Sequence, residues 1–233
     1  MRNLDAQFGG DFVKEESVPL RVEKKLYRVL FKVLKAVLSR HVWPIIVVGA
    51  VSCFLTRINV LEYSVFPFLY RILLLHISLI IFVATEEFFH ICAAYSVGAS
   101  ETVKEIRFRY CSIGKMKLYA LNASVHICGK MSKQQYVIIM LAGPSLTTLL
   151  WICSVLIIAC LYPLHTLIRP FWNIVLPGLF VISSLTPIGG SDMEQALIKL
   201  REFEKINTRR MVYEVFKAAK HTIVFLYYHF FEK

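Results

Sequence analysis

Four apolar stretches constrain the fold of this chain most, because each reaches or approaches the length needed to cross a lipid bilayer. They run from about Val42 to Val60, Val65 to Val97, Tyr136 to Tyr162 and Phe171 to Ile188. A membrane-spanning helix needs about 20 predominantly apolar residues. The chain of 233 residues is 57% hydrophobic, above the roughly 45–50% that is typical of soluble domains. The sequence therefore predicts a mainly α-helical, polytopic membrane protein with about four spanning helices.

The distribution of Lys and Arg predicts how the chain is oriented in the membrane. Residues 1–41 carry nine, residues 96–134 carry seven and residues 189–233 carry eight, whereas the segments between them carry three in total. Because positive residues concentrate in cytoplasmic segments, we expect a multi-pass protein of the cell membrane with both termini and the middle segment in the cytoplasm. The net charge of +11 is then a topology signal with some attraction to anionic lipid. No nucleic-acid-binding motif accompanies it, so the bilayer and not a nucleic acid is the expected partner.

Composition divides the chain into three parts. Residues 1–41 form a cytoplasmic segment in which Val22 to Val37 has the apolar and basic faces of an interfacial helix. Residues 42–188 form the membrane core. Residues 189–233 form a cytoplasmic helical tail that carries Asp192, with an apolar end expected to dock at the membrane surface.

A small β-sheet is predicted between the second and third spans, at about residues 102–127. Thr102 to Arg109 alternates apolar and charged residues, and Lys115 to Ala120 and Ala123 to Ile127 are further short candidates, separated by turn residues. Unpaired strand edges cannot lie in lipid. We therefore expect this sheet on the cytoplasmic side.

The second stretch ends in three ionisable residues within five positions, Glu86-Glu87-Phe88-Phe89-His90. Charged groups at membrane depth cost roughly 2.5 kcal/mol or more, so they mark functional sites. On a helix Glu86 and His90 stack on one face, with Glu87 about 100° round the axis. This is the spacing of the zinc motif His-Glu-x-x-His with glutamate in place of the first histidine.

A hydrolytic zinc site needs a third protein ligand and an open position for water. Asp192 is the candidate, because it follows a break rich in Pro and Gly at the end of the fourth stretch, on the same side of the membrane. We expect Glu86, His90 and Asp192 to bind Zn²⁺ or another divalent metal. Glu87, beside the open position, is the expected catalytic base that deprotonates water.

These motifs together resemble the site-2 protease family of intramembrane zinc metalloproteases, including its peptide-processing branch. The resemblance rests on residues 86–90 with the following Ile91 to Ala99, on Ala142-Gly143-Pro144, and on Pro187 with Asp192 five residues later. It implies His90 and Asp192 as metal ligands and Glu87 as catalytic base. The implied activity is a metal-dependent endopeptidase that cleaves a membrane-associated peptide or a single-span substrate.

The sequence departs from the family pattern at three positions. Glu86 stands where the family has histidine, Ser184 where it usually has asparagine, and Met193 where glycine follows the aspartate. These departures favour, as the alternative, a catalytically inactive membrane scaffold or an immunity-type binding protein. A carboxylate is nevertheless an acceptable zinc donor, and it would also suit manganese or iron.

Simpler interpretations of the same residues exist. Glu86 and Glu87 are also typical of a solvated helix end, and Asp192 could be the N-cap of the helix that follows it. The pair Glu87-x-x-His90 occurs in di-iron carboxylate bundles, but those need a second such pair. The sequence has none.

Overall fold

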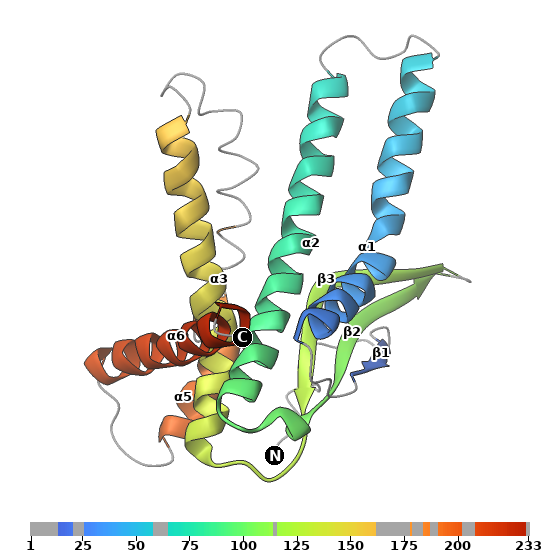
Figure 1. Ribbon diagram of the computed structural model, residues 1–233. Coiled ribbons are helices and arrows are strands. Elements are labelled where there is room, and N and C mark those ends of the chain that lie inside the picture. Colours follow the sequence, from blue (N-terminus) through green and yellow to red (C-terminus); the bar gives the residue numbers. More distant parts are fainter. Residues whose placement is uncertain are drawn as a thin grey trace.

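The computed structural model describes residues 14–20, 26–57, 65–113, 116–161, 178, 184–186, 191–201 and 208–231. The elements follow the order β1 (Lys14–Pro19), α1 (Leu26–Arg57), α2 (Val65–Ser96), the 3-10 helix η2 (Ser100–Thr102), β2 (Val103–Ile113), β3 (Met116–Ile127), α3 (Lys133–Leu161), α5 (Asp192–Arg201) and α6 (Thr208–Phe231). Helix α2 packs between α1 and α3, and the sheet lies at the lower end of α1 and α2 (Figure 1). Helices α5 and α6 gather around the lower half of α3.

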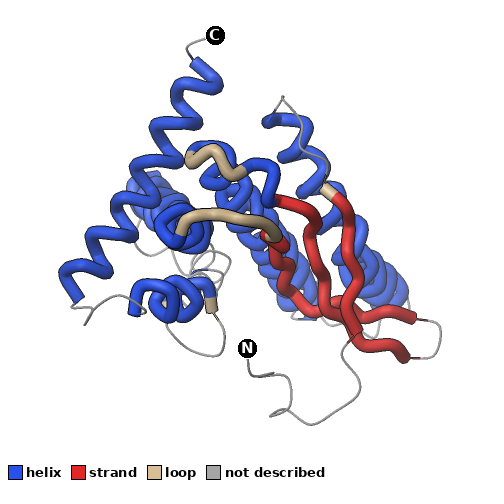
Figure 2. The backbone as a smooth tube through the Cα atoms, turned by 90° about the horizontal axis from the view of Figure 1, so that it is seen from below, coloured by secondary structure: helices blue, strands red, loops and turns tan. Residues whose placement is uncertain are grey.

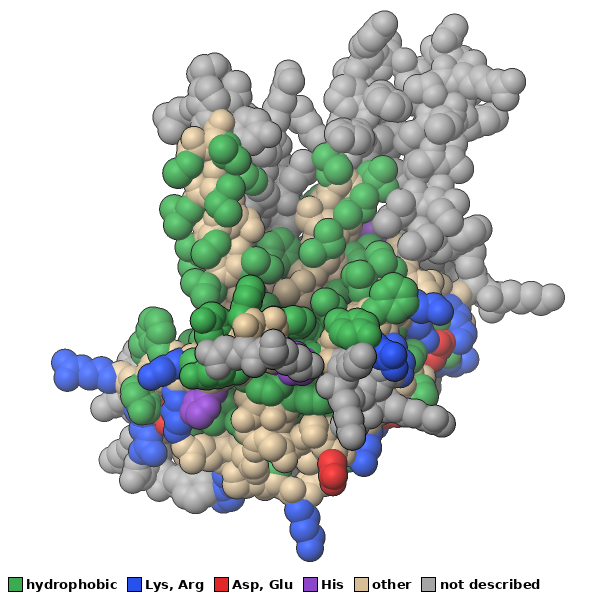
Figure 3. All heavy atoms as spheres, viewed as in Figure 1, with side chains coloured by type: hydrophobic (Ala, Val, Ile, Leu, Met, Phe, Trp, Pro, Cys, Tyr) green, Lys and Arg blue, Asp and Glu red, His purple; other side chains and the backbone are tan. Residues whose placement is uncertain are grey.

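The second and third predicted spans are confirmed as helices, α2 and α3. Within the described residues, Leu73–Ser96 and Lys133–Leu161 are the two helical segments long and apolar enough to cross a membrane. The upper half of α3 leaves apolar side chains exposed (Figure 3): Leu149, Leu150, Ile152, Leu156, Ile157 and Leu161. Exposed apolar surface of this extent is what a lipid-facing helix presents.

The first predicted span and the amphipathic helix before it are parts of one helix. Helix α1 runs without a break from Leu26 to Arg57, so the interfacial helix expected up to Val37 and the span expected from Val42 are continuous. No glycine or proline lies between these two residues, and the backbone therefore continues as a helix. The fourth predicted span, Phe171 to Ile188, falls outside the described residues except at 178 and 184–186.

The predicted sheet is confirmed with three strands, but two of the predicted strands form one, β3, and a strand from outside the predicted range, β1, joins the sheet. It is antiparallel throughout, in the order β1-β2-β3, and its three strands lie side by side in Figure 2. The predicted break at Asn122 is a shift of register inside one strand, because Phe108 pairs with Ala123 but Tyr110 pairs with Tyr119. Such bulges bend a strand without ending it.

Strand β1 was not predicted, because half of Lys14–Pro19 is charged and the segment lacks an apolar alternation. It forms the edge of the sheet beside β2. An edge strand tolerates both its charges and its terminal proline.

The C-terminal tail also differs from expectation. Apolar periodicity from Met193 to Phe216 predicts one helix in this tail, whereas the structure has two, α5 and α6, with residues 202–207 between them outside the described part. Residues 221–231, expected as a separate docking segment, are the second half of α6. The apolar periodicity continues through both helices and does not mark where one ends.

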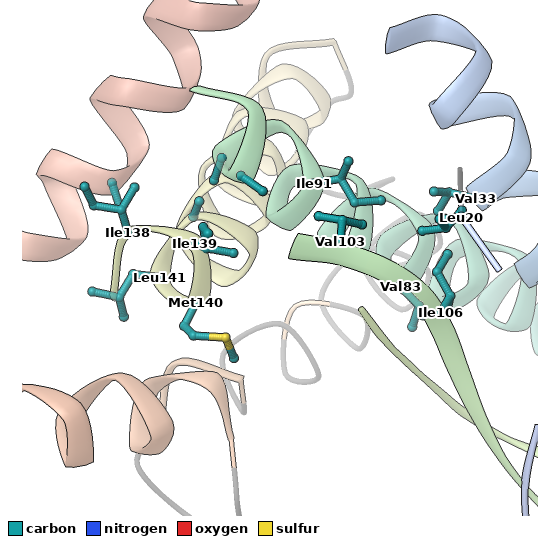
Figure 4. Close-up of a cluster of buried hydrophobic side chains, with 14 of the residues drawn as sticks. Leu20, Val33, Val83, Ile91, Val103, Ile106, Ile138, Ile139, Met140 and Leu141 are labelled. Atoms are coloured by element: carbon teal, nitrogen blue, oxygen red, sulfur yellow. The ribbon is translucent and has the colours of Figure 1, made fainter. Parts of the chain in front are cut away.

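The core lies where α2, α3 and β2 meet. Ile91, Val103 and Ile139 are buried in it, one from each element (Figure 4).

Two hydrogen-bonded motifs fix where α2 ends and where α3 begins. Gly98, with φ of 70°, ends α2, and the Ala99 amide donates to Ala94 O (2.8 Å), which is a Schellman-type stop. Before α3, Ser132 and Gln135 exchange side-chain-to-backbone hydrogen bonds as a capping box.

One carboxylate ties the extra strand to the rest of the fold. Glu16 of β1 accepts hydrogen bonds from Arg40 Nη2 of α1 (2.6 Å), and from Lys117 Nζ (2.6 Å) and Tyr119 OH (2.7 Å) of β3. The Lys117 ammonium first, then the Tyr119 hydroxyl and Arg40, lower the pKa of Glu16 from its ordinary 4.5 to about 2. Because Glu16 contacts both α1 and β3, its charge stabilises the junction between the sheet and the first helix.

The pKa of Glu16 predicts how acid weakens this junction. A carboxylate with a lowered folded-state pKa stabilises the fold fully above its unfolded-state pKa, and the contribution is lost as pH falls through the folded-state value. We expect Glu16→Gln to lower the thermal unfolding midpoint at neutral pH, and the difference from wild type to shrink between about pH 4.5 and 2. Thermal unfolding of both proteins across this range measures it. Glu101→Gln, on the exposed 3-10 turn, is the control, and a difference that stays constant down to pH 2 would contradict the role of Glu16.

Candidate metal centre

Glu86, His90 and Asp192 lie together in the lower half of the molecule. Each offers one ligand atom, and these three atoms all lie within 4.8 Å of one another. Glu86 and His90 come from successive turns of α2, and Asp192 is the first residue of α5. His90 Nε2 lies 2.9 Å from Asp192 Oδ2. The structure thus brings together the three residues that the sequence predicted as ligands.

The burial of these groups tests whether a cation fits. Glu86 is 6% exposed and His90 is 4% exposed, so the interpretation of residues 86–90 as a solvated helix end is wrong. Oε1 of Glu86 is buried without a hydrogen-bond partner. An unpartnered buried carboxylate oxygen is costly, and a bound cation would satisfy it. Imidazole nitrogen and carboxylate oxygen are also the donors that zinc, manganese and iron accept.

The charged side chains around Glu86, His90 and Asp192 also indicate a cation site. Glu87 is also buried, at 6% exposure, and lies close enough to interact electrostatically with His90 and Asp192. Three carboxyl groups therefore surround one imidazole. Among the ion pairs of the described residues, none gives a Lys or Arg partner to any of these acids. Buried carboxylates without basic partners are typical of sites that hold a cation.

The orientation of His90 suits a ligand. Its Nδ1 lies 2.7 Å from the carbonyl oxygen of Ile139 in α3. A carbonyl only accepts, so Nδ1 carries the hydrogen, and Nε2 is the ring nitrogen that faces Asp192 and that a metal could bind. Histidine ligands of metals are commonly held by such a bond from the other ring nitrogen.

Helix α3 has a local sequence that makes room for this ring. A Cβ atom added at Gly143 would overlap the His90 imidazole. Pro144, one residue later, has no amide hydrogen, so the carbonyl of Met140 loses its usual helical partner. The Ala142-Gly143-Pro144 motif thus lets α3 approach α2 at the level of His90, because small residues permit close contact between helices.

Asp192 is not the N-cap of α5. That position belongs to Ser191, whose hydroxyl oxygen accepts from the amide of Glu194 (3.3 Å). The Asp192 carboxylate is therefore available to His90. Three residues along α5, Gln195 accepts a hydrogen bond from the Tyr136 hydroxyl of α3 (3.0 Å), and this bond fixes α5 beside α3.

Glu87 lies outside the three-residue group, on the side of α2 that faces the sheet. Its Oε2 accepts a hydrogen bond from the backbone amide of Val125 in β3 (2.7 Å). Strand β3 is the end strand of the described sheet, so this amide points away from β2 and toward α2. The expected catalytic base therefore lies between the ligand group and a sheet edge.

Sequence reasoning missed the groups that orient the site. The carbonyl of Ile139 and the amide of Val125 belong to the backbone, which every residue carries, so no residue type signals them. The Gly143 and Pro144 pair was the available sign that α3 comes close at this point.

No protein-family model, curated protein or solved structure matches this chain. The functional interpretation therefore depends on the residues of the site and their geometry.

The close approach of α3 to His90 predicts an unusual effect of Gly143→Ala. Inside a helix this change ordinarily stabilises by up to about 1 kcal/mol. Here the new methyl group would meet the imidazole, so we expect destabilisation of about 1–3 kcal/mol, as for overpacked cores. Chemical unfolding in detergent measures it, with Ser154→Ala on the exposed part of α3 as the control. A variant as stable as wild type would show that Gly143 does not seat the ring.

Proposed function

We propose that this protein is a membrane-embedded, metal-dependent endopeptidase that cleaves a membrane-associated peptide or a single-span substrate. The observation that carries the proposal is the buried group of Glu86, His90 and Asp192, whose ligand atoms lie within 4.8 Å although Asp192 is 102 residues from His90 in sequence. The resemblance of these motifs to the site-2 protease family supports the same reaction class. We also propose a multi-pass arrangement in the cell membrane, with both termini cytoplasmic, from the distribution of Lys and Arg.

Glu86, His90 and Asp192 would hold the metal, for which Zn²⁺ is the first candidate. When bound, a divalent cation polarises a peptide carbonyl and makes water a better nucleophile at neutral pH. The two carboxylates would balance the charge of the dication. His90 is held in the tautomer that a ligand needs by its bond to Ile139.

Glu87 acts as general base in this proposal. It would take a proton from the attacking water and deliver it to the leaving amine. The Val125 amide occupies one of its oxygens, and a carboxylate has about four lone-pair sites, so acceptor capacity remains for water. The same amide fixes the orientation of the carboxylate relative to His90.

The position of β3 suggests how a substrate could be held. Peptide hydrolysis needs an extended backbone, and an extended peptide can add to an exposed strand edge. Glu87 already occupies the Val125 amide, so a peptide would add to the outer edge of β3 next to Val125, and it would then run beside Glu87. Membrane-associated segments of this kind are the substrate class that we propose.

Metal content tests the ligand set directly. We expect purified wild-type protein to hold one divalent metal per chain, and His90→Ala and Asp192→Asn to lose it, because each removes a donor from the group. Glu86→His should retain metal, since histidine is an equally good donor at this position. Elemental analysis after dialysis measures the stoichiometry, and Glu194→Gln on the same helix is the control. Metal-free wild-type protein would instead favour the inactive scaffold or immunity-type binding protein.

Cleavage tests the role of Glu87. We expect Glu87→Gln to retain metal but to lower the rate of cleavage by about 10²–10⁴-fold, the usual contribution of a general base. New N-termini of membrane proteins in cells that express wild type or Glu87→Gln measure it. Glu101→Gln, on the exposed 3-10 turn, is the matched control. An unchanged set of cleaved substrates in cells that express Glu87→Gln would contradict the role of this residue as general base.

A further inference from the structure

Helix α6 lies across the spanning helices. In Figure 1 it runs nearly perpendicular to α3, and the view from below in Figure 2 shows it extended while α2 and α3 are seen end-on. Its inner face is buried at Glu214, Ala218 and Thr222. It packs against both α2 and α3. If α2 and α3 cross the bilayer, α6 therefore lies in the membrane plane.

The opposite face of α6 is apolar and exposed. Phe216 is 71% exposed and Phe231 is 77% exposed. At 100° per residue, eight of the nine large apolar side chains exposed on α6 fall on one side of the helix: Val212, Tyr213, Phe216, Ile223, Val224, Tyr227, Phe230 and Phe231, whereas the exposed Tyr228 lies beside this face. A helix on a water-facing surface has the reverse pattern, with its polar face outward. This surface therefore requires a partner other than water.

Basic side chains lie within and beside this apolar face. Arg209 and Lys220 lie within it, and Arg210 and Lys217 lie along one flank, about 80–100° round the helix axis from its centre. Tyr and Phe with neighbouring Lys and Arg are the composition of helices that lie in the headgroup layer of a bilayer. The positive flank complements anionic lipid.

The start of α1 continues the same surface. Tyr27, Leu30 and Phe31 are exposed there, with Arg28 and Lys32 between and beside them. The two helices meet in one cluster, in which Phe225 and Leu226 of α6 pack with Leu26 of α1. Figure 3 shows apolar and basic side chains side by side at this level, below the exposed upper part of α3.

We propose that α6 and the first turns of α1 form an interfacial collar that lies in the headgroup layer of the membrane and binds anionic phospholipid. The same cluster includes Phe88 and Cys92 of α2, which alternate along the helix with Glu86 and His90. The collar therefore places the metal-binding group at the boundary between membrane and water, and not at the centre of the hydrocarbon. A site at this depth lies close to the water phase, although Glu86 and His90 themselves are buried.

The test uses the full-length protein in nanodiscs of phosphatidylcholine and phosphatidylglycerol. The photoreactive residue p-benzoylphenylalanine replaces Phe216 or Tyr227 on the collar, and Glu101 on the exposed turn as control. We expect lipid adducts, identified by mass spectrometry, at the two collar positions and none at residue 101. Adducts to a second copy of the chain, or no lipid adduct at either collar position, would overturn the proposal. The readout involves neither metal nor cleavage, so it stands or fails independently of the proposed function.

Charge reversal tests the preference for anionic lipid. We expect Lys217→Glu with Lys220→Glu to lower the retention of phosphatidylglycerol relative to phosphatidylcholine by about tenfold or more, because each basic residue near the surface contributes about 1 kcal/mol. Lys104→Glu with Lys130→Glu, two exposed residues outside the collar, carries the same change in charge and should leave the ratio unchanged. Lipid analysis of the purified proteins measures both. Equal ratios in all three proteins would overturn the binding of anionic lipid by the collar.

Discussion

The imidazole of His90 is the contact on which the lower half of the molecule depends, because it joins three helices. Its ring belongs to α2, one nitrogen donates to the backbone of α3 at Ile139, and the other faces Asp192 of α5. The ring fits only because Gly143 has no side chain. Helix α3 must therefore approach α2 at this turn, and α5 must begin where its first carboxylate reaches Nε2. This one side chain therefore links the positions of all three helices, to which the core and the Tyr136–Gln195 bond also contribute.

This arrangement gathers negative charge in a place with little water. Helix α2 supplies Glu86 and Glu87, and α5 adds Asp192, while the described ion pairs bring no Lys or Arg to them. The Val125 amide donates a hydrogen bond to one oxygen of Glu87, but Oε1 of Glu86 has no hydrogen-bond partner. Buried charges are tolerated when they are paired or bind a cation. A divalent metal at this point would resolve the imbalance that the protein atoms leave.

The sequence contains the chemistry of this site but only part of its scaffold. Helical spacing places Glu86 and His90 on one face, and the break before Asp192 brings a third donor to the same side; both inferences use residue types that are rare in membranes. Strand β1 could not be inferred, because its place depends on pairing with β2 and on the bonds of Glu16 to distant residues. The boundary between α5 and α6 was not predicted either, because the apolar periodicity of the sequence continues across it. Patterns of side chains predict faces, whereas partners far apart in sequence decide where elements begin and end.

Glu86 stands where the site-2 protease motif, which this sequence resembles, has histidine, and this difference would change the balance of the proposed reaction more than its geometry. A second carboxylate in the ligand set would neutralise a dication and weaken its pull on the electrons of water, so more of the basicity would have to come from Glu87. The structure gives Glu87 a fixed orientation through Val125. An interfacial position, set by the packing of Phe225 and Leu226 against Phe88, would at the same time supply the water that a site in the hydrocarbon lacks. A less acidic water, a well-placed base and an open water supply are mutually consistent, and together they make the substitution compatible with catalysis.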